Sequence, residues 1–155
     1  MSAELDIYNA VMNCLKGDSA LRSFVKGFYE GRREHIAGAQ FPCVMLSVEG
    51  IDPISRRHDN ERRAMRFVVG IYVNKWDIRE MYSSERNGIL HAYNLLDHAL
   101  LSGAIQHPPF GIGNHAISTV AIGQAVFPTV IVNEYPYFGI EMRFSIEYVV
   151  LNSER

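Results

Sequence analysis

The segment IEMRFSIEYVV, residues 140–150, carries the clearest structural signal in the chain, because apolar and polar side chains alternate along it with the period of a β-strand. The apolar members are Ile140, Met142, Phe144, Ile146, Tyr148 and Val150. Glu141, Arg143, Ser145 and Glu147 lie between them. A strand with this pattern packs one face on a hydrophobic core and turns the other toward water or another polar surface. We therefore predict a half-buried strand over residues 140–150.

Two earlier segments show the same alternation. From Ala64 to Asn74 the apolar positions on one side are Met65, Phe67, Val69, Ile71 and Val73. The segment CVMLSVE, residues 43–49, follows Phe41-Pro42, and a proline is tolerated at the start of a strand. Residues 50–63 hold a run of charged side chains and little apolar content, so we expect a solvated connection there. Simple hairpin connectivity makes the two flanking strands antiparallel.

The N-terminal segment predicts a short amphipathic helix over residues 3–15, with Gly17 as its stop. Its apolar residues recur at spacings of three and four: Leu5, Tyr8, Val11, Met12 and Leu15. Asp18 and Ser19 can cap one or two further helical turns. The glycines and basic residues of the stretch 27–38 break any regular pattern, and we predict a loop there.

A long helix is predicted from Ser83 or Ser84 to Gly103, with a stripe formed by Ile89, Tyr93, Leu96 and Leu100. Residues 103–115 contain two prolines and three glycines and are too irregular for a regular element. Two further strands are predicted over 116–122 and 125–132, and Pro128 marks the second as an edge, a bulge or a break.

The order of helix, strand, strand, helix and two or three strands predicts an α+β fold. We expect an antiparallel or mixed sheet of four to five strands, with two main helices packed on one face. A chain of 155 residues, 48% hydrophobic and 21% charged, lies within the ordinary range for one domain. We therefore predict a single domain over residues 1–155, with no internal repeat.

Composition and charge disfavour several classes of protein. Cys14 and Cys43 show no metal or disulfide spacing, and there is no basic-then-apolar leader, so a cytoplasmic location is expected. No apolar run approaches the ~20 residues that a membrane-spanning helix needs. The formal charge is −2, which does not supply the basic surface of a general nucleic-acid binder. We expect neither a membrane nor a nucleic acid as the default partner.

No motif for catalysis, metal binding or cofactor binding is present. His91 and His98 are seven residues apart on the predicted helix, and two turns of rise, about 10 Å, separate them too far for one zinc ion. The lone cysteines are most simply buried apolar groups, and no GxSxG motif occurs. We predict no metal, no cofactor and no enzymatic activity. The alternatives are a small-ligand binding domain, or an enzyme with an unrecognised site that uses His91 or His98 with Asp97.

Positive charge is concentrated in one stretch. The five arginines between residues 56 and 66 face only Asp59 and Glu61 as acids. These arginines are Arg56, Arg57, Arg62, Arg63 and Arg66. One interpretation is a solvated connection with internal ion pairs, which contribute little to stability. A second is an arm that reaches a neighbouring subunit or an acidic partner surface, where the arginine fork pairs with carboxylates. Phosphate binding ranks third, because the loop itself lacks aromatic stacking residues.

Aromatic residues gather just before the last predicted strand. Phe127, Tyr135, Tyr137 and Phe138 lie around two prolines. Packing beneath a loop is the commoner explanation for such residues. Interface anchoring by Tyr135, Tyr137 and Phe138 is the more specific hypothesis, because Tyr and Phe are enriched at the buried centres of protein contacts.

Short fragments in a characteristic order carry a family resemblance along nearly the entire chain. They are LKGDSAL at 15–21, FPCVML at 41–46, RFVVGIYV at 66–73, Leu100-Leu101 at the end of the long helix, and FGIEMRF at 138–144. With this order of elements, the chain resembles the tail-terminator, or tail-completion, proteins of long-tailed phages and prophages, including the Mu-like group.

The resemblance implies a structural, non-enzymatic role. Such proteins assemble as a six-membered ring on the tail tube, stop its polymerisation and present the surface that joins the head. The implied partners are further copies of the chain, the tail tube protein and a head-completion or connector protein. The implied location is the host cytoplasm during assembly and then the virion or tail particle. A hairpin arm commonly extends from the domain, and residues 50–64 match it here, whereas the insertion 103–115 is longer than the family pattern.

Overall fold

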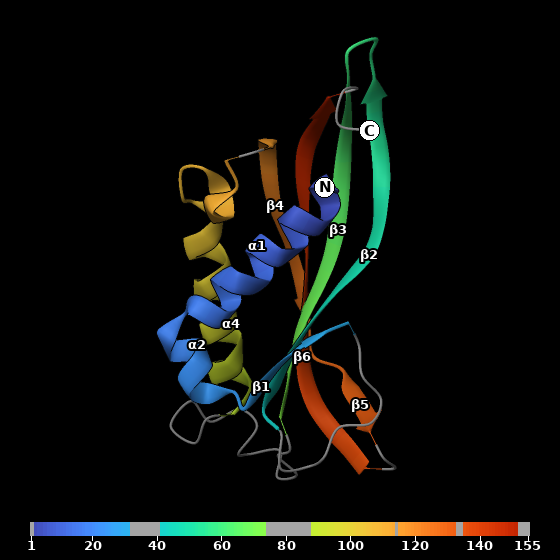
Figure 1. Cartoon of the computed structure of the whole chain (residues 1–155). Helices are drawn as coiled ribbons and strands as arrows, with labels where there is room; N and C mark the ends of the chain where they lie inside the picture. Colours follow the sequence, from blue (N-terminus) through green and yellow to red (C-terminus); the bar gives the residue numbers. More distant parts are fainter. Residues whose placement is uncertain (1, 32–40, 74–87, 114, 133–134, 152–155) are drawn as a thin grey trace.

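The computed structural model describes residues 2–31, 41–73, 88–113, 115–132 and 135–151 (Figure 1). The helices are α1 (Ala3–Gly17), α2 (Ser19–Phe24), α4 (Ile89–Ala104) and the short 3-10 helix η2 (Pro109–Gly111). The strands are β1 (Gly27–Glu30), β2 (Cys43–Arg56), β3 (Asn60–Val73), β4 (Ala116–Val126), β5 (Thr129–Val132) and β6 (Tyr135–Leu151).

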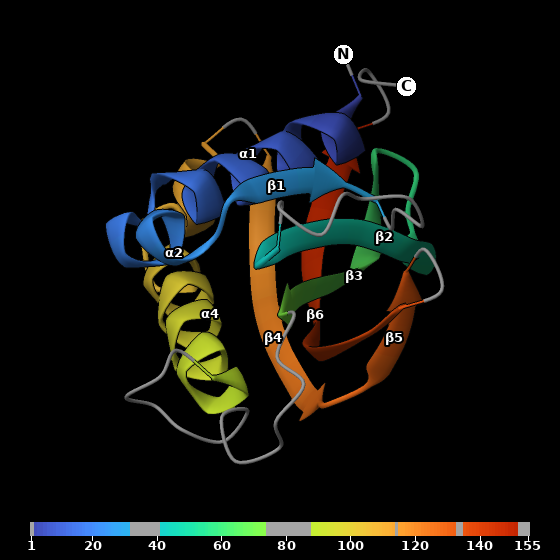
Figure 2. The same cartoon turned by 90° about the horizontal axis from the view of Figure 1, so that it is seen from below.

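All of these strands belong to one mixed sheet. The continuous strand order is β1-β2-β3-β6-β4, and β5 pairs with β6 beside this path. The β1–β2 pair is parallel, and every other pair is antiparallel. Figures 1 and 2 show α1, α2 and α4 together on one face of the sheet. The predicted α+β fold, with a mixed sheet and two main helices on one face, is therefore confirmed.

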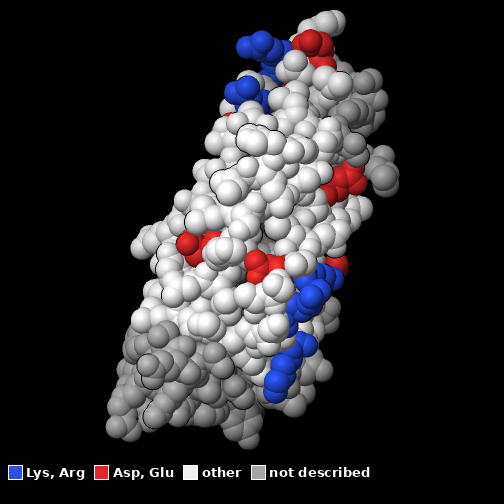
Figure 3. Space-filling model, turned by 90° about the vertical axis from the view of Figure 1, so that its left-hand side faces the viewer, with Lys and Arg blue, Asp and Glu red and all other residues white. Residues whose placement is uncertain are grey.

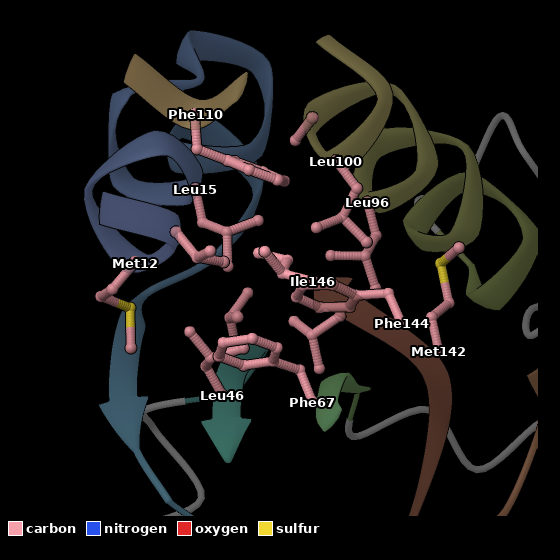
Figure 4. Close-up of a cluster of buried hydrophobic side chains, with 14 of the residues drawn as sticks. Met12, Leu15, Leu46, Phe67, Leu96, Leu100, Phe110, Met142, Phe144 and Ile146 are labelled. Atoms are coloured by element: carbon pink, nitrogen blue, oxygen red, sulfur yellow. The ribbon is translucent and has the colours of Figure 1, made fainter. Parts of the chain in front are cut away.

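The predicted strands lie where the alternation placed them, and β6 contains the whole of residues 140–150. Its six alternating apolar side chains are all buried. Phe144 stacks on Phe67 of β3, with ring centroids 4.8 Å apart. Figure 4 shows how these rings meet Leu15 of α1 and Leu96 of α4. Each side chain of this size contributes about 1.5–3 kcal/mol when it is fully buried, so the layer between sheet and helices holds the fold together.

Two loop predictions are wrong. Residues 50–63 do not form a long connection, because β2 runs to Arg56 and β3 starts at Asn60, leaving a short turn. Backbone pairing from Cys43↔Tyr72 to Arg56↔Glu61 maintains these strands although their outer side chains are polar. In the stretch 27–38, residues 27–30 form β1, which is too short to show periodicity; residues 32–38 lie outside the described residues.

Smaller differences concern element ends. The helix predicted from Ser83 or Ser84 begins at Ile89 within the described residues, and its predicted start lies outside them. The irregular stretch 103–115 contains the last residues of α4 and the turn η2. Pro128 separates β4 from β5, so it is a break between two strands.

Candidate interaction surfaces

The β2–β3 hairpin projects beyond the helix layer (Figure 1). We call residues 50–64 the arm. The side chains from Ile51 to Asp59 are all exposed. The turn at its tip is closed by a hydrogen bond of 2.7 Å that the Arg57 amide donates to the Asn60 carbonyl. The predicted arm is therefore an ordered two-stranded element.

Arg63 is committed to the fold itself. Its guanidinium lies 2.6 Å from Glu4 Oε1 and 3.2 Å from Glu61 Oε2, and it is only 24% exposed. Tyr148 donates a further hydrogen bond of 2.8 Å to Glu4 Oε1. This network ties the first turn of α1 to β3 and β6. Strand alternation explains it, because Arg63 shares the helix-facing side of β3 with Met65 and Phe67.

Protonation in this network follows from burial and hydrogen bonding. Burial acts to raise the pKa of Glu4, but hydrogen bonds from Tyr148 and Arg63 outweigh it and hold that pKa below its ordinary value. Burial, together with the bond to Glu4, raises the pKa of the Tyr148 hydroxyl. Hydrogen bonds to Glu61 and Glu4 raise the pKa of Arg63 further. At neutral pH the network is an ion pair that neutral Tyr148 completes.

The other four arginines between residues 56 and 66 are exposed. Arg66 pairs with Asp52 of β2 at 2.7 Å, and Arg56 lies 3.5 Å from Glu61. The described residues supply no ion-pair partner to Arg57 or Arg62. Figure 3 shows basic side chains at the hairpin end of the molecule. Arg57 and Arg62 therefore offer positive charge to a partner, whereas Arg56, Arg63 and Arg66 each pair with an acid of the same chain.

The predicted aromatic anchors pack mainly inside the protein. Tyr137 is 6% exposed and stacks on Phe41 with ring centroids 4.0 Å apart. Phe138 is partly buried against the main core. The side chain of Tyr135 lies outside the described residues. Phe127 is 46% exposed and meets Tyr93 of α4 at 6.4 Å, so it is the accessible aromatic of this group.

His91 and His98 of α4 do not have the surroundings expected of a catalytic pair. His91 packs edge-on against Phe24, with ring centroids 5.5 Å apart. His98 is 75% exposed and lies 3.7 Å from Asp18. The contacts of the described residues join neither ring to Asp97. Within the same residues, no three His, Cys, Asp or Glu side chains gather as metal ligands.

Sequence reasoning missed the pair formed by Asp6 and His115, because these residues are 109 positions apart. His115 Nε2 lies 3.1 Å from Asp6 Oδ2, and the His115 side chain is 8% exposed. Its Nδ1 is buried without a hydrogen-bond partner among the described residues. The pair borders a cavity of about 290 Å³ that Asn9 and Asn13 also line. Asp6 lies in α1 and His115 directly precedes β4. The pair therefore joins α1 to the start of β4.

Neither cysteine has the character of an activated nucleophile. Burial raises the pKa of Cys43 to about 12. Burial and the charge of Asp18 also raise the pKa of Cys14, which lines an open cavity of about 580 Å³ between α1 and α4. Only the thiolate is reactive, so both groups behave as small apolar side chains at neutral pH.

A second surface of the molecule is nearly free of charge. Between Gly88 and Asn133, Asp97 is the only formally charged side chain. We call the surface of α4, η2 and β4 the uncharged face; α4 and β4 lie side by side in Figures 1 and 2. Its exposed apolar residues are Leu90, Leu101, Ile105 and the adjoining Phe127. In Figure 3 this side of the molecule is mainly white, with a few acidic side chains.

No helix within the described ranges is both long and apolar enough to span a membrane. The sequence matches no protein-family model, and it matches no curated protein.

Proposed function

We propose that this chain is a structural tail protein of a phage or prophage that forms a ring, hexameric by the family resemblance, on the tail tube. The ring ends polymerisation of the tube and offers the surface to which the head joins. Its partners are other copies of itself, the tail tube protein and a head-completion or connector protein. The action is one of shape and charge, and it requires no catalytic group.

The observation that carries this proposal is the projecting arm. It lies at residues 50–64, where the resemblance expects a hairpin arm, and it combines exposed Ile51 and Ile54 with the available cations Arg57 and Arg62. A hairpin that served only to connect two strands would gain nothing from nine consecutive exposed residues, from Ile51 to Asp59. Such an element suits contact with a partner.

The distribution of surfaces supports the same proposal. To stop a polymer, a ring needs one surface that binds the last layer of the tube and another that does not repeat this contact. The basic tip of the arm and the uncharged face differ in chemistry and lie on different parts of the molecule (Figures 1 and 3). Unlike surfaces on one chain are also what head-to-tail assembly into a closed ring requires.

Light scattering coupled to size exclusion, followed by electron microscopy, tests the ring. We expect a hexamer at high concentration and an annulus with a hole of the width of the tube. Added to tail tube protein during polymerisation, the protein should shorten the tubes and appear at their ends. A strict monomer at every concentration that leaves tube length unchanged would refute the proposal.

A charge variant tests the arm. The triple variant Arg56→Ser, Arg57→Ser, Arg62→Ser spares Arg63, which the fold needs. The matched control Lys16→Ser, Arg22→Ser, Lys26→Ser removes the same charge from exposed positions near α1 and α2. We expect the arm variant to lose ring formation or attachment to tubes and the control to keep both. Equal behaviour of the two variants would remove the arm from the proposed contact.

A further inference from the structure

We propose that the outer edge of β2 in one copy pairs with the free edge of β4 in the next copy, so that the sheet continues from subunit to subunit. This inference rests on the proposed ring function and identifies the contact through which the copies join. The segments involved are Ser47–Asp52 of β2 and Ala116–Val126 of β4.

Both edges of the sheet are open over these segments. β1 covers one edge of β2 only at Cys43–Leu46, and from Ser47 onward the described residues place no strand on that edge, while β3 pairs along the other. β4 pairs with β6 on one side and has no strand on its other side within the described part of the chain. An open edge presents unpaired N–H and C=O groups that can pair with another chain. Pro53 has no backbone N–H to donate. We therefore place the part of the β2 edge that pairs with another strand before this residue.

The edge of β4 lacks the usual protection against such pairing. Natural edge strands are commonly guarded by charged side chains, lysine above all, and by proline. The eleven residues of β4, AISTVAIGQAV, contain no Lys, Arg, Asp, Glu or Pro. Its two register shifts, between Ile117 and Thr119 and between Ile122 and Ala125, leave the stretch between them regular. An unguarded edge of this length is expected to be covered in the working protein.

Exposed apolar side chains lie along β2 and on or beside the uncharged face. Val48, Ile51 and Ile54 are 39%, 44% and 46% exposed along β2. Leu101, Ile105 and Phe127 are 44%, 72% and 46% exposed on and beside the uncharged face. Within one copy β3 and β6 separate β2 from β4 and the adjoining Phe127, so a single copy cannot bring these side chains together. A second copy can, in a head-to-tail contact.

The charges at the two edges are compatible with a second copy as the occupant. Glu49 and Asp52 of the β2 edge are already paired within their own sheet, at 3.2 Å with Arg143 and at 2.7 Å with Arg66. They therefore require no cation from the strand that docks against β2. The β4 edge, which holds no charge of either sign, can cover them without leaving a new unpaired ion.

The strand directions also fit a ring. β2 and β6 are each antiparallel to β3, and β4 is antiparallel to β6, so β4 runs opposite to β2. Rotation about an axis along the strands preserves strand directions from copy to copy. The β2–β4 contact is then antiparallel, and closing the ring removes every open edge of this kind.

Lysines placed on the two edges test the contact. Ala121→Lys changes an exposed residue of β4, and Ile51→Lys changes an exposed residue of β2. The control Ala20→Lys places the same charge on exposed α2. We expect each edge variant to weaken self-association at least about tenfold, because an unpaired charge enters the contact, and the control to leave it unchanged. Circular dichroism shows whether the variants keep the fold.

Disulfide trapping gives an independent measurement. Ser47→Cys is combined with Thr119→Cys or with Ala121→Cys; the partners of these positions in β3 and β6 place them on the helix-free face of the sheet. Within one chain these pairs lie at opposite edges, so a disulfide must join two copies. Because disulfides need Cα atoms about 4.4–6.8 Å apart, we expect a ladder of linked oligomers for at least one combination. The control pair Ser47→Cys with Ala20→Cys should give none.

The outcomes separate this inference from the proposed function. Rings that resist both lysine variants and give no ladder overturn the β2–β4 contact and leave the ring proposal standing. Edge-linked oligomers that never close into an annulus support the contact and refute the ring. Absence of self-association at every concentration overturns both.

Discussion

Arg62 and Arg63 are neighbours in the sequence with opposite tasks, because successive residues of a strand face opposite sides of the sheet. Arg63 turns toward the helices and meets Glu4 and Glu61. Arg62 turns away and is exposed. Both were grouped as contact residues from the sequence, where they look identical. The structure assigns Arg63 to the internal ion-pair interpretation and leaves Arg62 available to a partner.

This difference predicts unequal stability effects. Arg63→Met leaves Glu4 and Glu61 without their shared cation in a partly buried setting, and we expect a loss of about 2–4 kcal/mol in the free energy of unfolding. Arg62→Met should change that free energy by less than about 0.5 kcal/mol. Urea denaturation measures both. Similar losses for the two variants would contradict the assigned orientation of the strand.

Glu4 predicts a pH dependence of stability. Its pKa in the folded protein lies below the ordinary value of 4.5, so the unfolded chain binds the proton more tightly. The stabilisation is therefore fully present above about pH 4.5 and is lost as the pH falls through the folded pKa. Partial exposure to water limits it to about 1 kcal/mol. Urea denaturation near neutral pH and near pH 3 should show a smaller acid loss in Glu4→Gln than in the unmodified protein; equal losses would contradict the prediction.

At the scale of elements, β3 and β6 are held in contact around the ring of Tyr72. This side chain is 3% exposed and donates a hydrogen bond of 2.8 Å to Glu141. A Cβ at Gly139 would lie 2.5 Å from Tyr72 Cδ1, and one at Gly70 would lie 2.6 Å from the Tyr72 hydroxyl. Glycine is required at these two positions because it has no Cβ and leaves room for the buried Tyr72 ring.

Alanine substitutions at Gly139 and Gly17 should distinguish the close approach to Tyr72 from the general effect of replacing a glycine. Gly139→Ala forces the buried ring to move, and we expect it to lower the midpoint of urea unfolding, with a cost of about 1–3 kcal/mol. Gly17→Ala meets nothing within 4 Å at the end of α1, and we expect no loss or a gain of up to about 1 kcal/mol. A tolerated Gly139→Ala would show that the β3–β6 contact is looser than described.

The arm is the element for which periodicity was least informative. Its backbone pairs from Gly50↔Arg66 to Arg56↔Glu61, but beyond the contact of Arg63 with the first turn of α1 it projects past the helices (Figure 1). Alternation of apolar and polar residues appears only where one face of a strand is buried. The arm lacks a buried face of this kind over much of its length, so its residues resemble those of a loop. Pairing between β2 and β3 holds the arm together, and the sequence alone does not show which strands pair.

At the scale of the whole molecule, charge is unevenly divided. The chain carries 32 formally charged side chains, yet only Asp97 falls between Gly88 and Asn133. The tip of the arm, by contrast, combines Arg56, Arg57 and Arg62. A monomer in water gains nothing from such a division, whereas a ring that must contact both its own copies and a tube can use it.

A ring also makes thermal stability depend on concentration. Association stabilises the folded state by mass action, so raising the protein concentration about a hundredfold should raise Tm by several degrees. Ile51→Lys, which places charge in the proposed contact, should keep its Tm nearly constant over the same range. Differential scanning calorimetry measures both, and a concentration-independent Tm in the unmodified protein would contradict assembly in that range.

The sequence by itself determined the α+β class and the buried faces of β3 and β6, because strand periodicity records which side of a strand meets the core. It also located α1 and most of α4, and it marked Pro128 as an edge, a bulge or a break, which the structure resolves as a break between β4 and β5. Only the tertiary structure decided that β1 lies parallel to β2, that Arg63 faces Glu4, that Asp6 meets His115 and that Tyr137 stacks on Phe41. These contacts join residues distant in the chain or depend on register. Local patterns of hydrophobicity and charge carry no information about which distant segment arrives beside them.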